Sequence, residues 1–342
     1  MIGKTPGRCP IVEGGVMEFS LQPFLERVKA QGLGLYGIVV RQGGQVVANH
    51  HTRRDVPVNV YSASKSFTSV GIGIAIDEGL LPSVDELVLP YFAESLQPGY
   101  DPRLAQLTVR HLLTMTGGID HRFLMMNRFE EPYCRDYVAY ILSKPLLSEP
   151  GTRFLYSSSS TYLLSALLTK LSGQSLRDYL MPRLFEPLDI PYPQWSLCPK
   201  GISFGGSGLF LHTEHLSRFA QMLLQGGVYG GRRIVSAAYL QAATSPQVNS
   251  RGDQHQGTRG GAPATQTSAE VEPVWYGFQF WCCREDPGAY QAAGLYSQFA
   301  LVVPGRALAI GLTAHEETKG AQLSAALWEE VVRRFPLAGE AR

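Results

Sequence analysis

Apolar and polar positions divide the chain into two β-rich ends and a helical middle. Residues 35–40 and 45–50 are apolar or alternating, and Gly43-Gly44 between them predicts a β-hairpin. Near the other end, residues 276–283, 297–303 and 307–313 have the composition of strands. Amphipathic patterns at 19–31 and 321–335 predict a helix before the first strands and another after the last.

The region between these ends is predicted to be mostly helical. The expected helices span residues 62–78, 108–115, 136–142, 159–171, 175–180, 213–225 and 236–243. We therefore expect an α/β fold in which both ends of the chain build one antiparallel sheet flanked by helices. In this interpretation residues 1–79 and 201–342 form the sheet domain, and residues 80–200 form an inserted helical domain.

Composition narrows the functional classes. The 342 residues include 30 Lys and Arg against 29 Asp and Glu, and this balance argues against a nucleic-acid binder or a membrane-surface protein. The five cysteines are Cys9, Cys134, Cys198, Cys282 and Cys283, an odd number that favours buried reduced thiols. Residues 1–15 lack the apolar core of a signal peptide, and no apolar run could span a bilayer. We expect a soluble, cytoplasmic protein.

Several short segments match known sequence motifs but lack the neighbouring strand, helix or ligand that each motif requires. Residues 32–37 satisfy G-x-G-x-x-G but follow a helix and open a strand, the reverse of a dinucleotide site. Residues 201–205 satisfy G-x-S-x-G around Ser203, but prolines break the strand that a nucleophile elbow requires. His212 and His215 lack a third metal ligand, so a solvated helix face is expected. Residues 247–273 are polar and predicted to be a lid or disordered.

Ser62-Ala63-Ser64-Lys65 is the leading chemical candidate. Residues i and i+3 share one helix face, so a neutral Lys65 amine could take the proton of the Ser62 hydroxyl. Burial would lower the lysine pKa, and a helix N-terminus would favour the alkoxide. The alternative is a helix cap followed by a solvated lysine.

Four segments, in order, are similar to one family. Residues 60–68 (VYSASKSFT) resemble the active-site helix of the serine hydrolases related to class C β-lactamases. Residues 107–119 (LTVRHLLTMTGGI) resemble the family's T-x-R-H-L-L-T-H-T-S-G segment, and residues 150–157 (PGTRFLYS) resemble P-G-x-x-F-x-Y-S-N. Residues 205–209 (GGSGL) resemble G-G-x-G-L. The resemblance implies a β-lactamase/transpeptidase-like fold with its active site in the cleft between the two predicted domains.

The resemblance also implies roles for two residues near position 157. Tyr156 corresponds to a tyrosine that shares proton transfer with the lysine; the alternative is an aromatic residue packed on Leu163 or Leu164. Ser158 stands where most relatives have Asn, and it either binds substrate or caps the next helix. This departure argues against recognition of the amide side chain of β-lactams.

Residues 292–299 (AAGLYSQF) resemble the A-x-G-x-G-G-Q strand of the 6-aminohexanoate-dimer hydrolase and carboxylic esterase branch. No Lys or His stands where β-lactamases hold the substrate carboxylate. Gly294 would let this strand approach the substrate closely. An amide at or within two residues of Leu295 would complete an oxyanion hole with the amide of Ser62. Tyr133, Trp195, Trp275 and Tyr296 line either a substrate pocket or the core.

These observations predict a serine hydrolase that acts on a small ester or amide through an acyl-enzyme on Ser62. An acyltransferase using the same site, or a non-catalytic ligand-binding protein on the same fold, are the alternatives. A β-lactamase proper is disfavoured because the cationic anchor and the signal peptide are missing. No metal or organic cofactor is expected, and no nucleic acid or membrane partner. The oligomeric state stays open.

Overall fold

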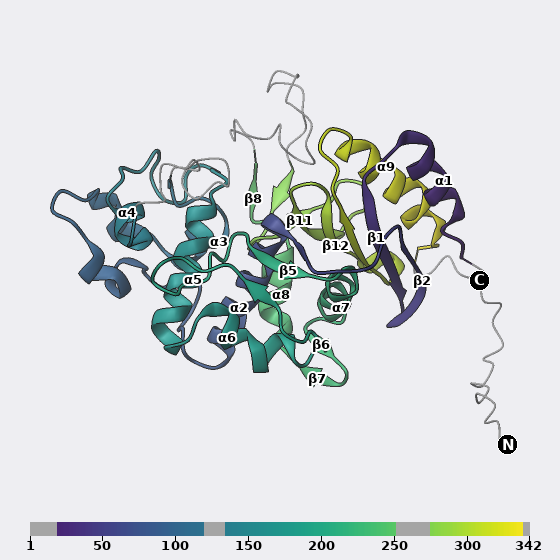
Figure 1. Ribbon diagram of the computed structural model, residues 1–342. Helices are drawn as coiled ribbons and strands as arrows, with labels where there is room; N and C mark the ends of the chain where they lie inside the picture. The colour runs from purple at the N-terminus through teal and green to yellow at the C-terminus, as the bar shows by residue number, and fades with distance from the viewer. Residues whose placement is uncertain (1–18, 120–133, 251–273, 338–342) are drawn as a thin grey trace.

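The computed structural model describes residues 19–119, 134–250 and 274–337. An eight-stranded antiparallel sheet lies at its centre, and helices cover both faces (Figure 1). In sheet order the strands are β2 (Gln45–His51), β1 (Leu35–Gln42), β13 (Leu308–Ala314), β12 (Gln298–Val303), β11 (Tyr290–Gly294), β10 (Trp281–Cys282), β9 (Trp275–Tyr276) and β8 (Val248–Asn249). The predicted α/β architecture is confirmed.

Strands from both ends of the chain meet inside this sheet. β1 pairs with β13 along its length, from Leu35 opposite Ala314 to Gln42 opposite Leu308. The predicted hairpin joins β1 to β2, and Gly43 and Gly44 both adopt positive φ, at 57° and 89°. Two consecutive left-handed residues match the right-handed twist of the strands, which explains the glycine pair.

Helices pack on the two faces of the sheet. One face holds α1 (Gln22–Gln31) and α9 (Gly320–Glu330), which share an apolar cluster with β1, β12 and β13. α7 (Thr213–Leu224) covers the other face. It approaches β13 so closely that a Cβ at Gly311 would lie 2.5 Å from the Thr213 carbonyl oxygen. A side chain at this position would push the helix away from the sheet.

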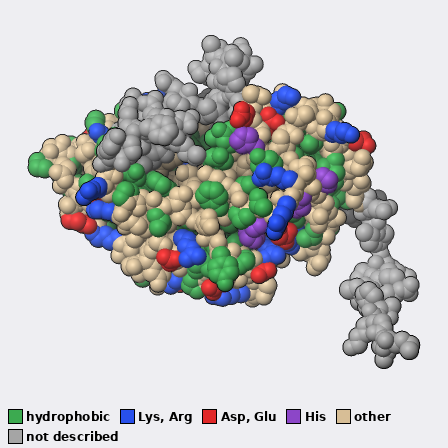
Figure 2. Space-filling view, viewed as in Figure 1, with side chains coloured by type: hydrophobic (Ala, Val, Ile, Leu, Met, Phe, Trp, Pro, Cys, Tyr) green, Lys and Arg blue, Asp and Glu red, His purple; other side chains and the backbone are tan. Residues whose placement is uncertain are grey.

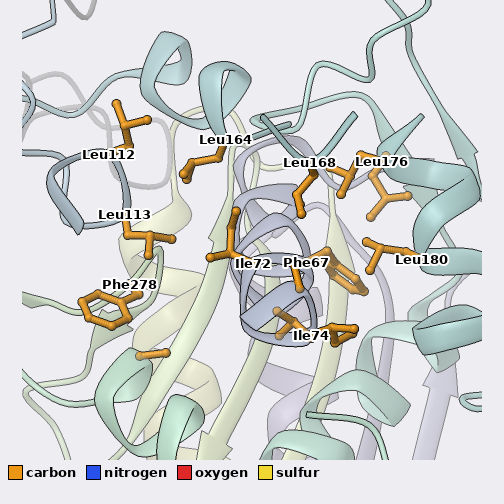
Figure 3. Close-up of a cluster of buried hydrophobic side chains, with 14 of the residues drawn as sticks. Phe67, Ile72, Ile74, Leu112, Leu113, Leu164, Leu168, Leu176, Leu180 and Phe278 are labelled. Atoms are coloured by element: carbon orange, nitrogen blue, oxygen red, sulfur yellow. The ribbon is translucent and has the colours of Figure 1, made fainter. Parts of the chain in front are cut away.

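The other helices pack on α2 (Ser64–Asp77), nearly all of which is buried, or on α5 beside it. They are α3 (Val109–Leu113), α4 (Tyr137–Leu142), α5 (Ser158–Ser172), α6 (Leu176–Leu180) and α8 (Ala237–Thr244). Figure 3 shows α2 side chains such as Phe67 and Ile72 enclosed by leucines of α5 and α6 and by Phe278. Phe67 is fully buried, so truncating it to alanine should cost about 3–5 kcal/mol. α2 therefore gives the candidate serine and lysine a rigid base.

Short elements complete the fold. A small sheet pairs β3 (Val58–Asn59) and β4 (Gln194–Trp195) with β5 (Leu209–Leu211), and β6 (Val228–Tyr229) pairs with β7 (Arg232–Arg233). Further short helical segments are η1 (Tyr61–Ala63), η2 (Leu89–Ser95), η3 (Pro102–Gln106), η4 (Met181–Phe185), η6 (Pro304–Arg306) and η7 (Val332–Arg334). In this small sheet β4 comes from the predicted helical domain, residues 80–200, and β3 and β5 come from the predicted sheet domain. The boundary between the two domains stays a prediction.

Two predicted strands are wrong. Residues 276–283 form β9 and β10 with a turn between them, where Gln279 has a φ of 64°. Residues 292–299 likewise divide into β11 and β12, and Tyr296 and Ser297 form the turn with φ of 61° and 68°. Positive φ favours glycine, and because none of these three residues is glycine, the sequence does not mark the left-handed positions.

Some predictions fall outside the described residues. Cys9, Tyr133 and most of the polar segment 247–273 lie there, although Val248 and Asn249 form the edge strand β8. Cys134, Cys198, Cys282 and Cys283 carry free thiols. No helix in the three described stretches is long and apolar enough to cross a membrane.

Candidate active site

Ser62 and Lys65 lie at the start of the buried helix. Ser62 belongs to η1, which continues directly into α2, and Tyr61 before it has a φ of 48°. The Nζ of Lys65 lies 3.0 Å from the Oγ of Ser62, within hydrogen-bond distance. The i, i+3 geometry expected from the Ser-x-x-Lys spacing is therefore present.

Lys65 is 1% exposed, so the alternative of a solvated lysine is wrong. Its amine also donates to the carbonyl oxygen of Gly206 at 2.8 Å and contacts the Oγ of Ser158 at 3.2 Å. Burial lowers the pKa of Lys65 to about 7, because the charged form loses its hydration. At neutral pH a large share of this amine is unprotonated and able to accept a proton.

Ser158 is the first residue of α5, not its cap. The N-cap is Ser157, whose hydroxyl accepts from the amide of Ser160 at 3.4 Å. Ser157 therefore caps the helix, and Ser158 directs its hydroxyl to the Lys65 amine. A Cβ at Gly206 would lie 3.4 Å from both Lys65 Nζ and the Cβ of Ser158, so glycine leaves the amine room.

Tyr156 places its ring beside the same amine. The Nζ of Lys65 lies 4.9 Å from the ring centroid of Tyr156. The ring stacks on Trp281 of β10, with centroids 5.6 Å apart and planes 21° from parallel, and it meets Tyr276 of β9 edge-on. These aromatic residues hold the phenol of Tyr156 next to Lys65.

The chain at Gly294 forms the opposite side of the site. A Cβ at Gly294 would lie 2.1 Å from the carbonyl oxygen of Val60, so any side chain would separate β11 from the segment before Ser62. Leu295 follows in the turn to β12. This contact brings the backbone around Leu295 toward Ser62, as the predicted oxyanion hole requires.

Several residues at the site were missed by sequence reasoning. Trp281 carries the Tyr156 ring, and Gly206 supplies a carbonyl to Lys65. Tyr296, already a candidate, packs edge-on against Tyr61 with centroids 5.2 Å apart, and its other neighbour is the tilted ring of His315 at 4.3 Å. His315 comes from the end of β13, so only the sheet register brings it here. Of the other candidate aromatic residues, Trp195 is buried and Trp275 is exposed.

The rejected motifs have structural explanations. Ser203 is fully buried, and its hydroxyl accepts from the amide of Arg177, which fits no exposed nucleophile. Gly32 ends α1 in a left-handed conformation. The His212 amide donates to Nδ1 of His215 at 3.4 Å, and burial lowers the pKa of His215 to about 4; both side chains are partly exposed. The described residues contain no cluster of three or more potential metal-ligating side chains.

Comparison with known proteins agrees with this geometry. The profile of one family, Beta-lactamase, matches residues 21–332. The chain belongs to the Beta-lactamase family. The resemblance seen in the sequence is thereby confirmed, and so is the expected class of serine hydrolases.

Related sequences in the Beta-lactamase family include hydrolases and acyltransferases. A 6-aminohexanoate-dimer hydrolase of Paenarthrobacter ureafaciens is 25% identical over 281 residues, which are 76% of this chain and 67% of that protein. An acyltransferase of Penicillium decumbens is 31% identical over 173 residues, 42% of this chain and 40% of that protein. The match therefore spans less than half of the acyltransferase.

Solved structures share the fold. A putative 6-aminohexanoate-dimer hydrolase from Bacillus anthracis superposes with a TM-score of 0.72 and 16% identity, and the match covers 96% of this chain and 87% of that one. At this identity the likeness establishes the Beta-lactamase-type fold alone. The predicted antiparallel sheet with flanking helices is confirmed by it.

Proposed function

We propose that this protein is a serine hydrolase that cleaves small esters or amides through an acyl-enzyme on Ser62. One observation carries the proposal: a buried amine, with its pKa lowered to about 7, lies 3.0 Å from the Ser62 hydroxyl. A serine hydroxyl is a weak nucleophile until a neighbouring base takes its proton. Burial makes Lys65 such a base near neutral pH.

The reaction follows from the positions of these groups. Lys65 accepts the Ser62 proton while Oγ attacks the carbonyl carbon, and the carbonyl oxygen becomes an oxyanion. Amides of Ser62 and Leu295 would donate to that oxyanion. The tetrahedral intermediate expels the alcohol or amine, which receives the proton through Tyr156. Water then attacks the acyl-enzyme carbonyl and gives its proton to Lys65, which passes a proton to the Ser62 Oγ as the acid leaves.

The substrate class is inferred from the charges near the site. Residues 292–294 contain no cation to bind a substrate carboxylate, which supports a neutral or weakly anionic ester or amide. Figure 2 shows acidic and basic side chains mixed on the visible face, which supports a small molecule over nucleic acid as the partner. The free thiols of the described cysteines support action in a reducing compartment such as the cytoplasm.

Acyl transfer is the second candidate function, favoured by the acyltransferase among the relatives. The same acyl-enzyme serves both functions, and only the acceptor differs. A binding protein without activity is the third candidate. The intact Ser62 hydroxyl and Tyr156 ring, both beside the Lys65 amine, argue against it.

The test compares wild type with Ser62→Ala on p-nitrophenyl acetate and butyrate. Wild type should turn over and Ser62→Ala should fall to background. Ser69→Ala, a buried serine two turns along the same helical segment, is the matched control and should retain activity. A fluorophosphonate probe should add to wild type and not to Ser62→Ala, as seen by intact mass. Equal activity of wild type and Ser62→Ala would reject the nucleophile.

Adding butanol to the same assay separates the two catalytic functions. A hydrolase gives free acid as its main product, whereas an acyltransferase gives mostly butyl ester. If neither variant reacts with the esters or the probe, the fold is used for binding.

A further inference from the structure

Gln279 is a turn residue with unusual properties. It lies between β9 and β10, yet it is only 2% exposed. Its φ of 64° is a conformation that non-glycine residues rarely adopt. Such strain persists only when surrounding contacts determine it.

The polar groups of Gln279 bind three different helices. Its side-chain nitrogen donates to the carbonyl oxygens of Leu112 at 3.0 Å and Leu113 at 2.9 Å, both on α3. Its side-chain oxygen accepts from the Thr161 hydroxyl of α5 at 2.7 Å. Its backbone carbonyl accepts from the Ser66 hydroxyl of α2 at 2.6 Å. These bonds hold α2, α3 and α5 to one turn.

Two of these partners adjoin the candidate catalytic groups. Ser66 is the next residue after Lys65 on α2. Thr161 follows Ser158 by three positions on α5, so both lie on one face of that helix. The distance between Lys65 and Ser158 therefore depends on how α5 packs against α2. Gln279 links these two helices through its bonds to Ser66 and Thr161.

The same turn also fixes the tyrosine side of the site. Trp281 follows Gln279 by two residues, and its ring supports the ring of Tyr156. A shift of the turn would move this support together with the bond to Thr161. One buried residue thus connects the segments that carry Lys65, Ser158 and Tyr156.

We propose that Gln279 is a positioning residue that holds α5 and the Tyr156 ring against Lys65 and keeps water away from its amine. This inference rests on the proposed function. The groups that face Lys65 are the hydroxyls of Ser62 and Ser158, the Gly206 carbonyl and the titratable ring of Tyr156.

The expected effect follows from the role of burial. The pKa of Lys65 is low because of desolvation alone, so water admitted between α2 and α5 raises it. A raised pKa leaves less free amine at pH 7 and restores it at higher pH. A general loss of folded protein would instead lower activity at every pH.

The test is the pH dependence of p-nitrophenyl acetate hydrolysis by the full chain carrying Gln279→Gly. Glycine adopts the positive φ without strain and keeps the backbone bonds, so the losses are the side-chain bonds and the buried space that the side chain fills. The rise in kcat with pH should move upward by about one pH unit, with a roughly five-fold loss at pH 7. By pH 9.5 kcat should return to within two-fold of wild type.

Tyr239→Phe is the matched control. It removes a buried hydroxyl that donates to the Ser69 carbonyl of α2 at 2.8 Å, at a position without contact to the catalytic candidates. Its pH profile should keep the wild-type midpoint. If Gln279→Gly also keeps that midpoint, whatever its activity, the residue is merely structural and the proposal is overturned.

A second variant tests the proposal if Gln279→Gly does not fold. Thr161→Val keeps the shape of the threonine and removes only the bond to the Gln279 side chain. It should move the midpoint in the same direction by a smaller amount, and an unmoved midpoint overturns the proposal. Loss of activity in Ser62→Ala establishes the proposed function separately, so the two failures are distinguishable.

Discussion

The two sides of Ser62 differ in which atoms face it. On the helical side, side chains make the contacts: Lys65 reaches Ser62 and Ser158, and the Tyr156 ring lies beside the amine. On the sheet side, backbone lies against backbone, because Gly294 brings β11 to the carbonyl of Val60, two residues before Ser62. Proton transfer needs side chains with suitable pKa values, whereas an oxyanion needs only amides in fixed positions.

The difference also sets how each side tolerates substitution. In the proposed mechanism each side chain on the helical side has its own role, so one replacement should weaken or remove that role. On the sheet side most replacements keep the amides, and only those that move the backbone matter. Variants of the helical side should therefore change kcat strongly, and variants of the β11–β12 turn should act mainly on stability.

Replacement of Lys65 should have the largest effect. Lys65→Met fills the same space without an amine, so kcat for p-nitrophenyl acetate should fall roughly 10³-fold. The thermal unfolding midpoint shows whether the variant is folded. A loss of less than ten-fold in a folded variant would mean that another base serves Ser62.

Tyr156→Phe should have the next largest effect. The ring keeps its stack on Trp281, so the fold should persist, while the proton path to the leaving group is lost. We expect kcat to fall roughly 10²-fold. Pre-steady-state measurement of p-nitrophenol release locates the slowed step. Wild-type rates would show that the phenol hydroxyl takes no part.

Activity and stability should both depend on pH through the titration of Lys65. Activity should rise with pH and reach half its maximum near pH 7, because the unprotonated amine is the base. Stability should rise above this pH, since the unfolded chain then binds the proton that the folded chain has lost. Urea unfolding from pH 7 to 9 should show this rise in wild type and not in Lys65→Met.

Ser158→Ala should have a smaller effect on the same side. It removes one contact to the Lys65 amine, worth about 1 kcal/mol, so kcat should fall about five-fold. Ser157→Ala is the comparison, because it removes the helix cap instead. It should lower the unfolding midpoint more than kcat. If Ser157→Ala lowered kcat more and Ser158→Ala lowered the unfolding midpoint more, the roles given to the two serines would be wrong.

Ser297→Gly should affect the rate least. Ser297 has a φ of 68° and is fully buried, and its hydroxyl has no hydrogen-bond partner among the described residues. Glycine relieves both penalties, so the free energy of unfolding should rise by about 1 kcal/mol, measured in urea. The kcat should stay within two-fold. A large drop in kcat would show that the serine hydroxyl contacts the substrate.

The helical side of the site was largely predictable from the sequence. Ser62 and Lys65 lie together because residues three apart share a helix face, whatever surrounds them. Tyr156 and Ser158 were found through the similarity of residues 150–157 to a family motif. The sheet built from both ends was predictable as well, since the hydrophobic pattern identified its main strands.

The rest depends on contacts that residue types do not encode. The turns at Gln279 and at Tyr296-Ser297 use positive φ without glycine, so the strands seemed continuous in the pattern. The partners of Gln279 lie more than one hundred residues away in sequence and meet it only after the helices pack. Every residue has a backbone carbonyl, so the sequence does not show which one accepts a hydrogen bond, as that of Gly206 does from Lys65.

The pairing of β1 with β13 has a consequence for synthesis. The ribosome releases the β1–β2 hairpin and Ser62 well before β11, β12 and β13, which follow them in the chain. Until then the open edge of β1 lacks its neighbour and is exposed to wrong partners. The contact between Gly294 and Val60 also has to wait. Nascent chains that stop before β11 therefore hold the serine and the lysine but lack the strand that packs beside them.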